Sequence, residues 1–292
     1  MSAPAPGELL LVATPIGNLG DLSPRACEVL READLICCED TRRTRALLSA
    51  AGIPAGGAQG DRLLSLHGHN ESSRVERVQA CLDGGGKVAV VSDAGTPGIS
   101  DPGSLLVAAL LASGHTVRPV PGPTSVIAAL AVSGLPTDRF CVEGFLPRKG
   151  AERRERLAAV MTDQRTTVIL EAPGRVAATL RDLSAFDEGR PVAVARELTK
   201  VHEEVWHGTV AEGVARYDEV APRGEVVLVV GGAPQQPPLS DDEVEDVVRA
   251  RLATAPDVGA RQMAEMLSLE LGVGRRRVYE AALRVREQSG SG

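Results

Sequence analysis

The sequence of 292 residues predicts two α/β domains followed by a small C-terminal helical module. Three observations support this prediction. Short apolar runs alternate with turns and amphipathic stretches as far as Val230, which is typical of β-α-β units. Pro121-Gly122-Pro123 interrupts this alternation, and the Pro/Gly-rich segment Gly231–Leu239 ends it. We therefore expect domains at residues 8–122 and 123–232 and the helical module at residues 240–288.

The first domain is expected to contain a mostly parallel sheet with helices on both faces. Its apolar runs predict strands at Leu9–Ala13, Leu35–Cys38, Leu63–Leu66, Val88–Ser92 and Thr116–Val120. Three residue pairs place a capping side chain before a helix: Ser23 before Pro24, Asn70 before Glu71, and Asp101 before Pro102.

The turn after the first strand carries Gly17 and Gly20 within the segment TPIGNLGD. Glycines ahead of a helix are typical of phosphate-binding loops, because the backbone can approach a ligand closely. Neither G-x-G-x-x-G nor G-x-x-x-x-G-K-[ST] fits this segment, which excludes the dinucleotide and Walker mechanisms. From spacing alone, an ordinary strand-to-helix turn and a ligand site both remain open.

The second domain has strands that follow one another more closely, which predicts a mixed sheet. The expected strands are Phe140–Phe145, Thr167–Glu171, Val192–Glu197, Val205–Val210 and Val226–Val230. The expected helices are Thr124–Ser133, Ala151–Met161 and Arg175–Leu183.

The C-terminal module is expected to be helical and to begin at a capping box, Ser240 to Glu243. Ala260–Leu271, Gly272 and Arg275–Val285 resemble a helix-turn-helix. The module is not generally basic, so we expect an accessory that packs on the rest of the protein or docks on its substrate, and DNA binding is the alternative.

Composition excludes several function classes. A net charge of −7 provides no overall attraction to nucleic acid, so any RNA contact requires local basic patches. One Trp, two Tyr and three Phe cannot build a base-stacking platform. No apolar run is long enough for a membrane helix, and we expect a cytoplasmic protein without a membrane partner.

The five cysteines contain no C-x-x-C pair, which predicts reduced thiols and no zinc site. His67 and His69 lack a third ligand, so no metal is expected there.

Polar residues concentrate in three loops at the ends of predicted strands: VVSDAGTPGISDPG (Val90–Gly103), PVPGPTSV (Pro119–Val126) and ARELTK (Ala195–Lys200). Ligands of open α/β sheets bind beyond the carboxyl ends of the strands, so these loops predict a binding site. The alternatives are ligand-free glycine turns, ordinary N-capping by Thr124 and a solvated charged rim.

Read together, these loops resemble a known family. The segments that carry the resemblance are TPIGNLGDLSPRA, CEDTRRT, LHGHNE, SDAGTPGISDPG, PGPTSV, GLPTDRFCVEGFLPRK and ARELTK. They are similar to the bacterial family of ribosomal RNA small subunit methyltransferases I, within the tetrapyrrole methylase-like superfamily. The resemblance runs from about Leu9 to Val230.

The resemblance implies two α/β domains of the tetrapyrrole methylase type, with S-adenosylmethionine in the cleft between them. It implies 2′-O-methylation of a cytidine ribose in the decoding region of 16S rRNA, within the small ribosomal subunit, and a homodimer. The residues implied to contact the cofactor are Ser92, Asp93, Ala94, Gly95, Thr96, Thr124 and Ser125, with Glu171, Ala172 and Ala195 of the second domain. Segment Leu170–Arg175 departs from the family pattern Tyr-Glu-Ser-x-His-Arg: Glu171 and Arg175 are present, but the aromatic residue and the histidine are absent.

A ribose hydroxyl is a poor nucleophile, so its methylation requires alignment together with a base or a nearby cation. Our candidate catalytic residues are Glu197, Lys200, Arg42 and His67, of which Glu197 and Lys200 share one strand end. This hypothesis predicts that Lys200→Ala retains cofactor affinity and loses turnover.

Two basic stretches are candidates for contact with RNA phosphates. One contains Arg148, Lys149, Arg153, Arg154 and Arg156, for which an exposed helix with ion pairs is the alternative; the other contains Arg42, Arg43 and Arg45. The alternative function is a methyltransferase acting on a small tetrapyrrole-like molecule, for which these basic stretches would have no use. A DNA-binding regulator would explain only the C-terminal module.

Overall fold

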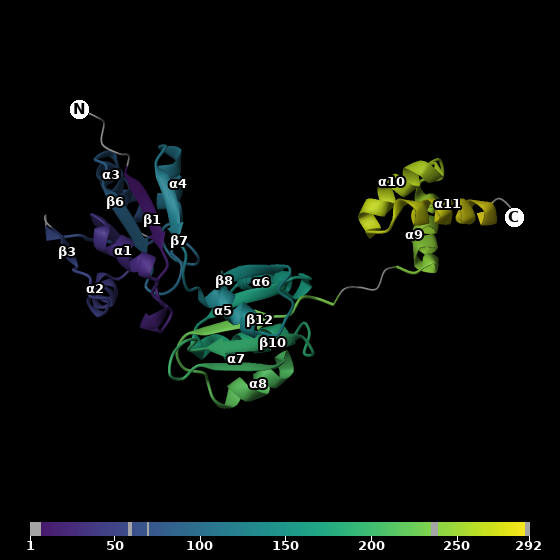
Figure 1. Cartoon of the computed structure of the whole chain (residues 1–292). Coiled ribbons are helices and arrows are strands. Elements are labelled where there is room, and N and C mark those ends of the chain that lie inside the picture. Colours follow the sequence, from purple (N-terminus) through teal and green to yellow (C-terminus); the bar gives the residue numbers. More distant parts are fainter. Residues whose placement is uncertain (1–6, 58–59, 69, 235–238, 290–292) are drawn as a thin grey trace. The chain divides into compact units, whose positions relative to one another are not determined.

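The computed structural model describes residues 7–57, 60–68, 70–234 and 239–289, so His69 and residues 235–238 of the Pro/Gly-rich segment lie outside it. The chain forms two compact units that divide after Ala233 (Figure 1). The first unit contains both five-stranded sheets. The domain boundary expected between residues 122 and 123 lies inside this unit and stays a prediction.

The first sheet is parallel throughout, with strand order β5-β2-β6-β1-β7. Its strands are β1 (Glu8–Val12), β2 (Leu35–Cys38), β5 (Leu63–Ser65), β6 (Lys87–Val91) and β7 (Thr116–Val120). Helices α1 (Pro24–Glu32) and α2 (Thr41–Ala50) cover one face, and α3 (Glu71–Asp83) and α4 (Ser104–Ala112) cover the other. A short hairpin, β3 (Gly56–Gly57) with β4 (Gly60–Asp61), precedes β5. The prediction of a mostly parallel sheet between two helical layers is confirmed.

The three predicted helix caps have different outcomes. Ser23 caps α1 by accepting a hydrogen bond from the backbone N–H of Ala26 at 3.1 Å. Asn70 precedes α3, but its side-chain oxygen Oδ1 accepts from the backbone N–H of His67 instead of capping the helix. The prediction for Asp101 is wrong, because α4 begins at Ser104 and the carboxylate of Glu71 accepts from the N–H groups of Gly103 and Leu106.

The second sheet is mixed, as predicted, with strand order β11-β10-β12-β9-β8. Strand β8 (Phe140–Phe145) pairs parallel with β9 (Thr166–Glu171), whereas β10 (Pro191–Arg196), β11 (Glu204–Thr209) and β12 (Val226–Val230) join by antiparallel pairs. Helix α5 (Ser125–Val132) packs on one face; α6 (Ala151–Thr162), α7 (Val176–Ser184) and α8 (Val210–Glu219) pack on the other. Val210, expected in a strand, begins α8, because Thr209 and Glu212 form a capping box there.

The second unit consists of α9 (Asp241–Thr254), α10 (Ala260–Leu271) and α11 (Arg275–Ser289) around a core of its own. The capping box at Ser240 and the helix-turn-helix are confirmed, and Gly272 takes a left-handed conformation with φ of 62° at the turn. Arg275, Arg276 and Arg277, which open α11, pair with Glu265, Glu280 and Asp241 respectively.

No helix among the described residues is long and apolar enough to cross a membrane. In the same part of the chain, no group of three His, Cys, Asp or Glu side chains is arranged to hold a metal ion. The five cysteines are free thiols, two of them buried and three half-buried.

Candidate functional site

A cavity of ≈ 950 Å³ lies at the carboxyl ends of the first sheet's strands and reaches residues of the second sheet. The first sheet contributes the turn after β1 and the loops after β2, β5, β6 and β7. Phe145, Leu170–Pro173 and Gly224–Val227 complete the lining. The cavity therefore lies where parallel α/β sheets bind ligands.

Most of the residues predicted to bind the cofactor line this cavity: Asp93, Ala94, Gly95, Thr96, Thr124, Ser125, Glu171 and Ala172. Ser92 does not line it; its buried hydroxyl donates to the carbonyl oxygen of Gly95 at 3.0 Å. Ala195 does not line it either, because it is buried in the core between the second sheet and α5.

The turn TPIGNLGD supports the glycine loop of the cavity. Thr14 and Gly95 exchange two backbone hydrogen bonds of 2.9 and 3.0 Å, and the Thr14 hydroxyl donates to the carbonyl oxygen of Ser92 at 3.1 Å. Gly95 has φ of +90°, a conformation that favours glycine. The turn thus holds the loop that lines the cavity, and of its own residues only Ile16 is part of the lining.

One wall of the cavity is acidic. Arg42 hydrogen-bonds Asp40 and lowers the pKa of that carboxyl to about 2. Asp93 accepts from the backbone N–H of Asp40 at 3.1 Å and lies 3.4 Å from the guanidinium of Arg43. Burial and then the charge of Glu39 raise the pKa of Asp101 to about 6. Burial and then the charge of Asp93 raise the pKa of Glu39.

Of the four candidate catalytic residues, only Arg42 and His67 line the cavity. The Asn70 side-chain nitrogen donates to the carbonyl oxygen of Ser65, which fixes the orientation of the amide. The same nitrogen lies 3.0 Å from Nε2 of His67, which must therefore accept. Neutral His67 consequently carries its proton on Nδ1.

Glu197 and Lys200 lie next to the cavity rather than on its lining. Lys200 Nζ donates to Glu197 at 2.8 Å and to Glu225, which lines the cavity, at 3.2 Å. The Lys200 hydrogen bond and then the backbone N–H of Glu225 lower the pKa of Glu197. The stem of Lys200 packs against Gly17, where an added Cβ would overlap it. The pair therefore links Gly17 of the first-strand turn with Glu225.

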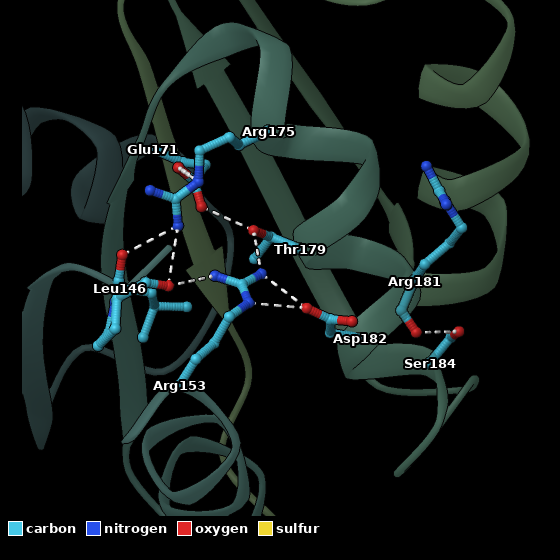
Figure 2. A network of polar contacts seen from close by, with 9 residues as sticks. Leu146, Arg153, Glu171, Arg175, Thr179, Arg181, Asp182 and Ser184 are labelled. Atoms are coloured by element: carbon cyan, nitrogen blue, oxygen red, sulfur yellow. Dashed lines mark hydrogen bonds and ion pairs between the residues drawn. The ribbon is translucent and has the colours of Figure 1, made fainter. Parts of the chain in front are cut away.

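A polar network surrounds Glu171, one of the cavity residues at the end of β9 (Figure 2). The buried Glu171 carboxylate accepts from the Thr179 hydroxyl at 2.6 Å and lies 3.2 Å from Nε of Arg175. Arg153 in turn donates to Thr179 at 3.0 Å and to Asp182 at 2.7 Å. The network ties Glu171, at the end of β9, to α6 and α7.

This network corrects part of the predicted phosphate track. Arg153 is 7% exposed and belongs to the network, and Arg156 hydrogen-bonds Glu143 at 2.8 Å. Arg148, Lys149 and Arg154 are exposed, and their contact with phosphates stays a prediction.

Comparison with known proteins agrees with this architecture. The family model "Tetrapyrrole (Corrin/Porphyrin) Methylases" matches residues 8–213. The chain belongs to this family. Within the tetrapyrrole methylases, the crystal structure of uroporphyrin-III C-methyltransferase from Thermus thermophilus complexed with S-adenosyl homocysteine matches with a TM-score of 0.53. It is 23% identical, covers 77% of this chain and 97% of its own, and shows the shared fold.

Two curated relatives are much more similar in sequence, and both are named ribosomal RNA small subunit methyltransferase I. The Synechocystis protein is 44% identical over 280 residues, which cover 95% of this chain and 98% of the relative. The Xylella fastidiosa protein is 52% identical over 234 residues, which cover 79% of this chain and 84% of the relative.

Sequence reasoning missed several cavity residues. Glu39 lies in the segment CEDTRRT, and Asp101 lies in the loop Val90–Gly103, from which the sequence predicts a binding site, but neither is among the predicted catalytic or cofactor-binding residues. Phe145 and Gly224–Val227 also line the cavity. No local pattern singled them out, because only the packing of the two sheets brings them to it.

Proposed function

We propose that this protein transfers a methyl group from S-adenosylmethionine to the 2′-oxygen of a cytidine ribose in the decoding region of 16S rRNA, within the small ribosomal subunit. The observation that carries the proposal is a cavity lined by the loops of a methylase family, in a chain 44% identical to a ribosomal RNA methyltransferase over nearly its whole length.

The cavity fits the methyl donor. Its ≈ 950 Å³ lie within the roughly 300–1,000 Å³ typical of small-molecule sites. Thr124 and Ser125 present backbone at the start of α5, where N–H groups can bind a carboxylate, and Gly95 of the loop after β6 lies beside Thr124. The acidic wall favours a cationic ligand and disfavours a phosphate. Bound there, S-adenosylmethionine would supply an electrophilic methyl group on a sulfonium.

The RNA partner is supported by exposed cations outside the cavity. Arg148 and Lys149 precede α6, and Arg154 lies on its surface, so all three can meet a phosphate backbone without breaking a buried contact. Because ribosomal RNA is the proposed substrate, we also infer a cytoplasmic location.

We further infer a homodimer. Ile127 of α5 and Phe140 and Val142 of the edge strand β8 are exposed at 47%, 37% and 41%. Unpaired edge strands that carry apolar side chains favour coverage by another chain. Light scattering on the purified protein would show a mass of two chains, and a single-chain mass would contradict the inference.

The reaction is tested by incubating the protein with isotopically labelled S-adenosylmethionine and small ribosomal subunits from cells that lack their own enzyme. The RNA is then digested and the labelled nucleoside identified. Label in 2′-O-methylcytidine supports the proposal. Bound S-adenosylmethionine without label in RNA would favour the alternative, a methylase of a small tetrapyrrole-like molecule.

A further inference from the structure

Nine ionisable side chains line the large cavity within the described residues: Glu39, Asp40, Arg42, Arg43, His67, Asp93, Asp101, Glu171 and Glu225. A general base for a ribose hydroxyl must lie on this lining, and its basicity must not be lowered by an adjacent cation or a strong hydrogen-bond donor. Arg42 and Arg43 cannot accept a proton. The Nε2 lone pair of His67 is held by Asn70.

Four of the carboxylates are engaged by cations. Asp40 pairs with Arg42 at 2.9 Å and Asp93 with Arg43 at 3.4 Å. Glu225 pairs with Lys200 at 3.2 Å. Glu171 pairs with Arg175 at 3.2 Å and accepts hydrogen bonds from the Thr179 hydroxyl and the backbone N–H of Ala172.

Glu39 and Asp101 remain, and neither forms an ion pair within the described chain. Glu39 is the more exposed of the two, so water reaches its carboxylate more readily than it reaches that of Asp101. Asp101 is half-buried, and the hydroxyl of Ser92 contacts it. Glu39 and Asp93 both place negative charge near Asp101.

We propose that Asp101 is the general base of the methyl transfer, a proposal that rests on the function proposed above. The ribose oxygen forms a bond to the methyl carbon as the carbon–sulfur bond breaks and its electron pair goes to sulfur. The hydroxyl proton passes to a carboxylate oxygen of Asp101 and leaves from there to solvent.

The charges around Asp101 suit this role. Desolvation and the like charges of Glu39 and Asp93 disfavour its ionised form. The result is a pKa raised to about 6, so that Asp101 is ionised at neutral pH and is a stronger base than an ordinary carboxylate.

The test compares Asp101→Asn with Asp138→Asn, an exposed carboxylate outside the cavity. Single-turnover methylation of small subunits is measured against pH, and S-adenosylmethionine affinity is measured by calorimetry. We expect Asp101→Asn to lower the rate roughly 10²- to 10⁴-fold and to remove the acid limb of the profile, with donor affinity nearly unchanged. Asp138→Asn should match the wild type.

A second readout needs no turnover. Carboxyl ¹³C NMR of the protein without donor should show one aspartate titrating near pH 6 that is absent from Asp101→Asn. Glu39→Gln should move this titration, and the acid limb, to lower pH because it removes a like charge. Full activity of Asp101→Asn with an unchanged acid limb would overturn the assignment. A wild type that methylates nothing would instead contradict the proposed function.

Discussion

The carboxylate of Glu71, on α3, accepts a hydrogen bond of 2.8 Å from the backbone N–H of Leu106, in the first turn of α4. The same oxygen accepts from the N–H of Gly103 at 3.1 Å, and the Glu71 residue is 3% exposed. A carboxylate is favoured at a helix N-terminus, where N–H groups lack partners within the helix. Glu71 therefore anchors the end of the loop that carries Asp101.

Replacing Glu71 by alanine should lower the free energy of unfolding by about 1–3 kcal/mol, because it leaves buried N–H groups without their acceptor. Denaturant unfolding measures this change. Glu76→Ala, on the same helix, has no such role and should stay near wild type. Equal losses for the two variants would contradict the capping role.

Arg153 and Arg154 are adjacent in the sequence, but replacing the first should affect stability and replacing the second should affect RNA binding. Arg153→Ala should cost about 1–3 kcal/mol of stability by leaving Asp182 and Thr179 without their donor. Arg154→Ala should leave stability unchanged and reduce the salt dependence of RNA binding by about one unit of slope. Unfolding curves and binding titrations at several salt concentrations test both expectations, and the reverse pattern would contradict them.

Gly95→Ala is expected to weaken donor binding, because φ of +90° strains an alanine in the loop that lines the cavity. Gly114→Ala is a matched control: its φ is +81°, and it lies in a turn outside the cavity with open space around it. Both variants should lose roughly 1–2 kcal/mol of stability. Calorimetry should show reduced affinity for S-adenosylmethionine in Gly95→Ala alone.

The variant Lys200→Ala tests whether the pair Glu197 and Lys200, predicted from the sequence, or Asp101, on the cavity lining, carries the catalysis. Lys200 reaches the cavity only through Glu225, so we expect donor affinity to persist and turnover to fall by less than about 10²-fold. Single-turnover rates beside those of Asp101→Asn test this. A reduction in the single-turnover rate as large as that of Asp101→Asn would show that Lys200 takes part in catalysis.

Asp101→Asn should stabilise the protein more at pH 8 than at pH 4.5. Because the pKa of Asp101 is raised to about 6, the folded state binds its proton more tightly than the unfolded state, and stability falls as pH rises from about 4 to about 6. Asparagine removes this cost, which after solvent screening is on the order of 1 kcal/mol, or about 2–4 °C in Tm. Thermal melts at the two pH values measure the difference; an equal shift at both would contradict the raised pKa.

Local patterns in the sequence determined most of the elements. Strands β2, β7, β8 and β12 have the predicted bounds. The runs of β2 and β12 are apolar throughout because both strands are buried, whereas β7 and β8 are largely exposed strands at the edges of their sheets. Helix starts at Ser23 and Ser240 were readable because capping acts over three residues. The sequence also predicted that the loop from Asp93 to Thr96 lines the binding site, because its glycine and polar residues are contiguous in the chain.

Only the tertiary structure decided which polar residues share the cavity. Asp101 reads locally as a helix cap, yet Glu71, from another helix, occupies that role and Asp101 lines the cavity. Arg153 reads as a surface cation, yet it is buried against Thr179 and Asp182. These outcomes depend on contacts between residues about 30 positions apart, and the energy of a buried charge is set by the partners that packing provides. The sequence by itself therefore determined the strands, helices and loops, and packing determined the chemistry of their side chains.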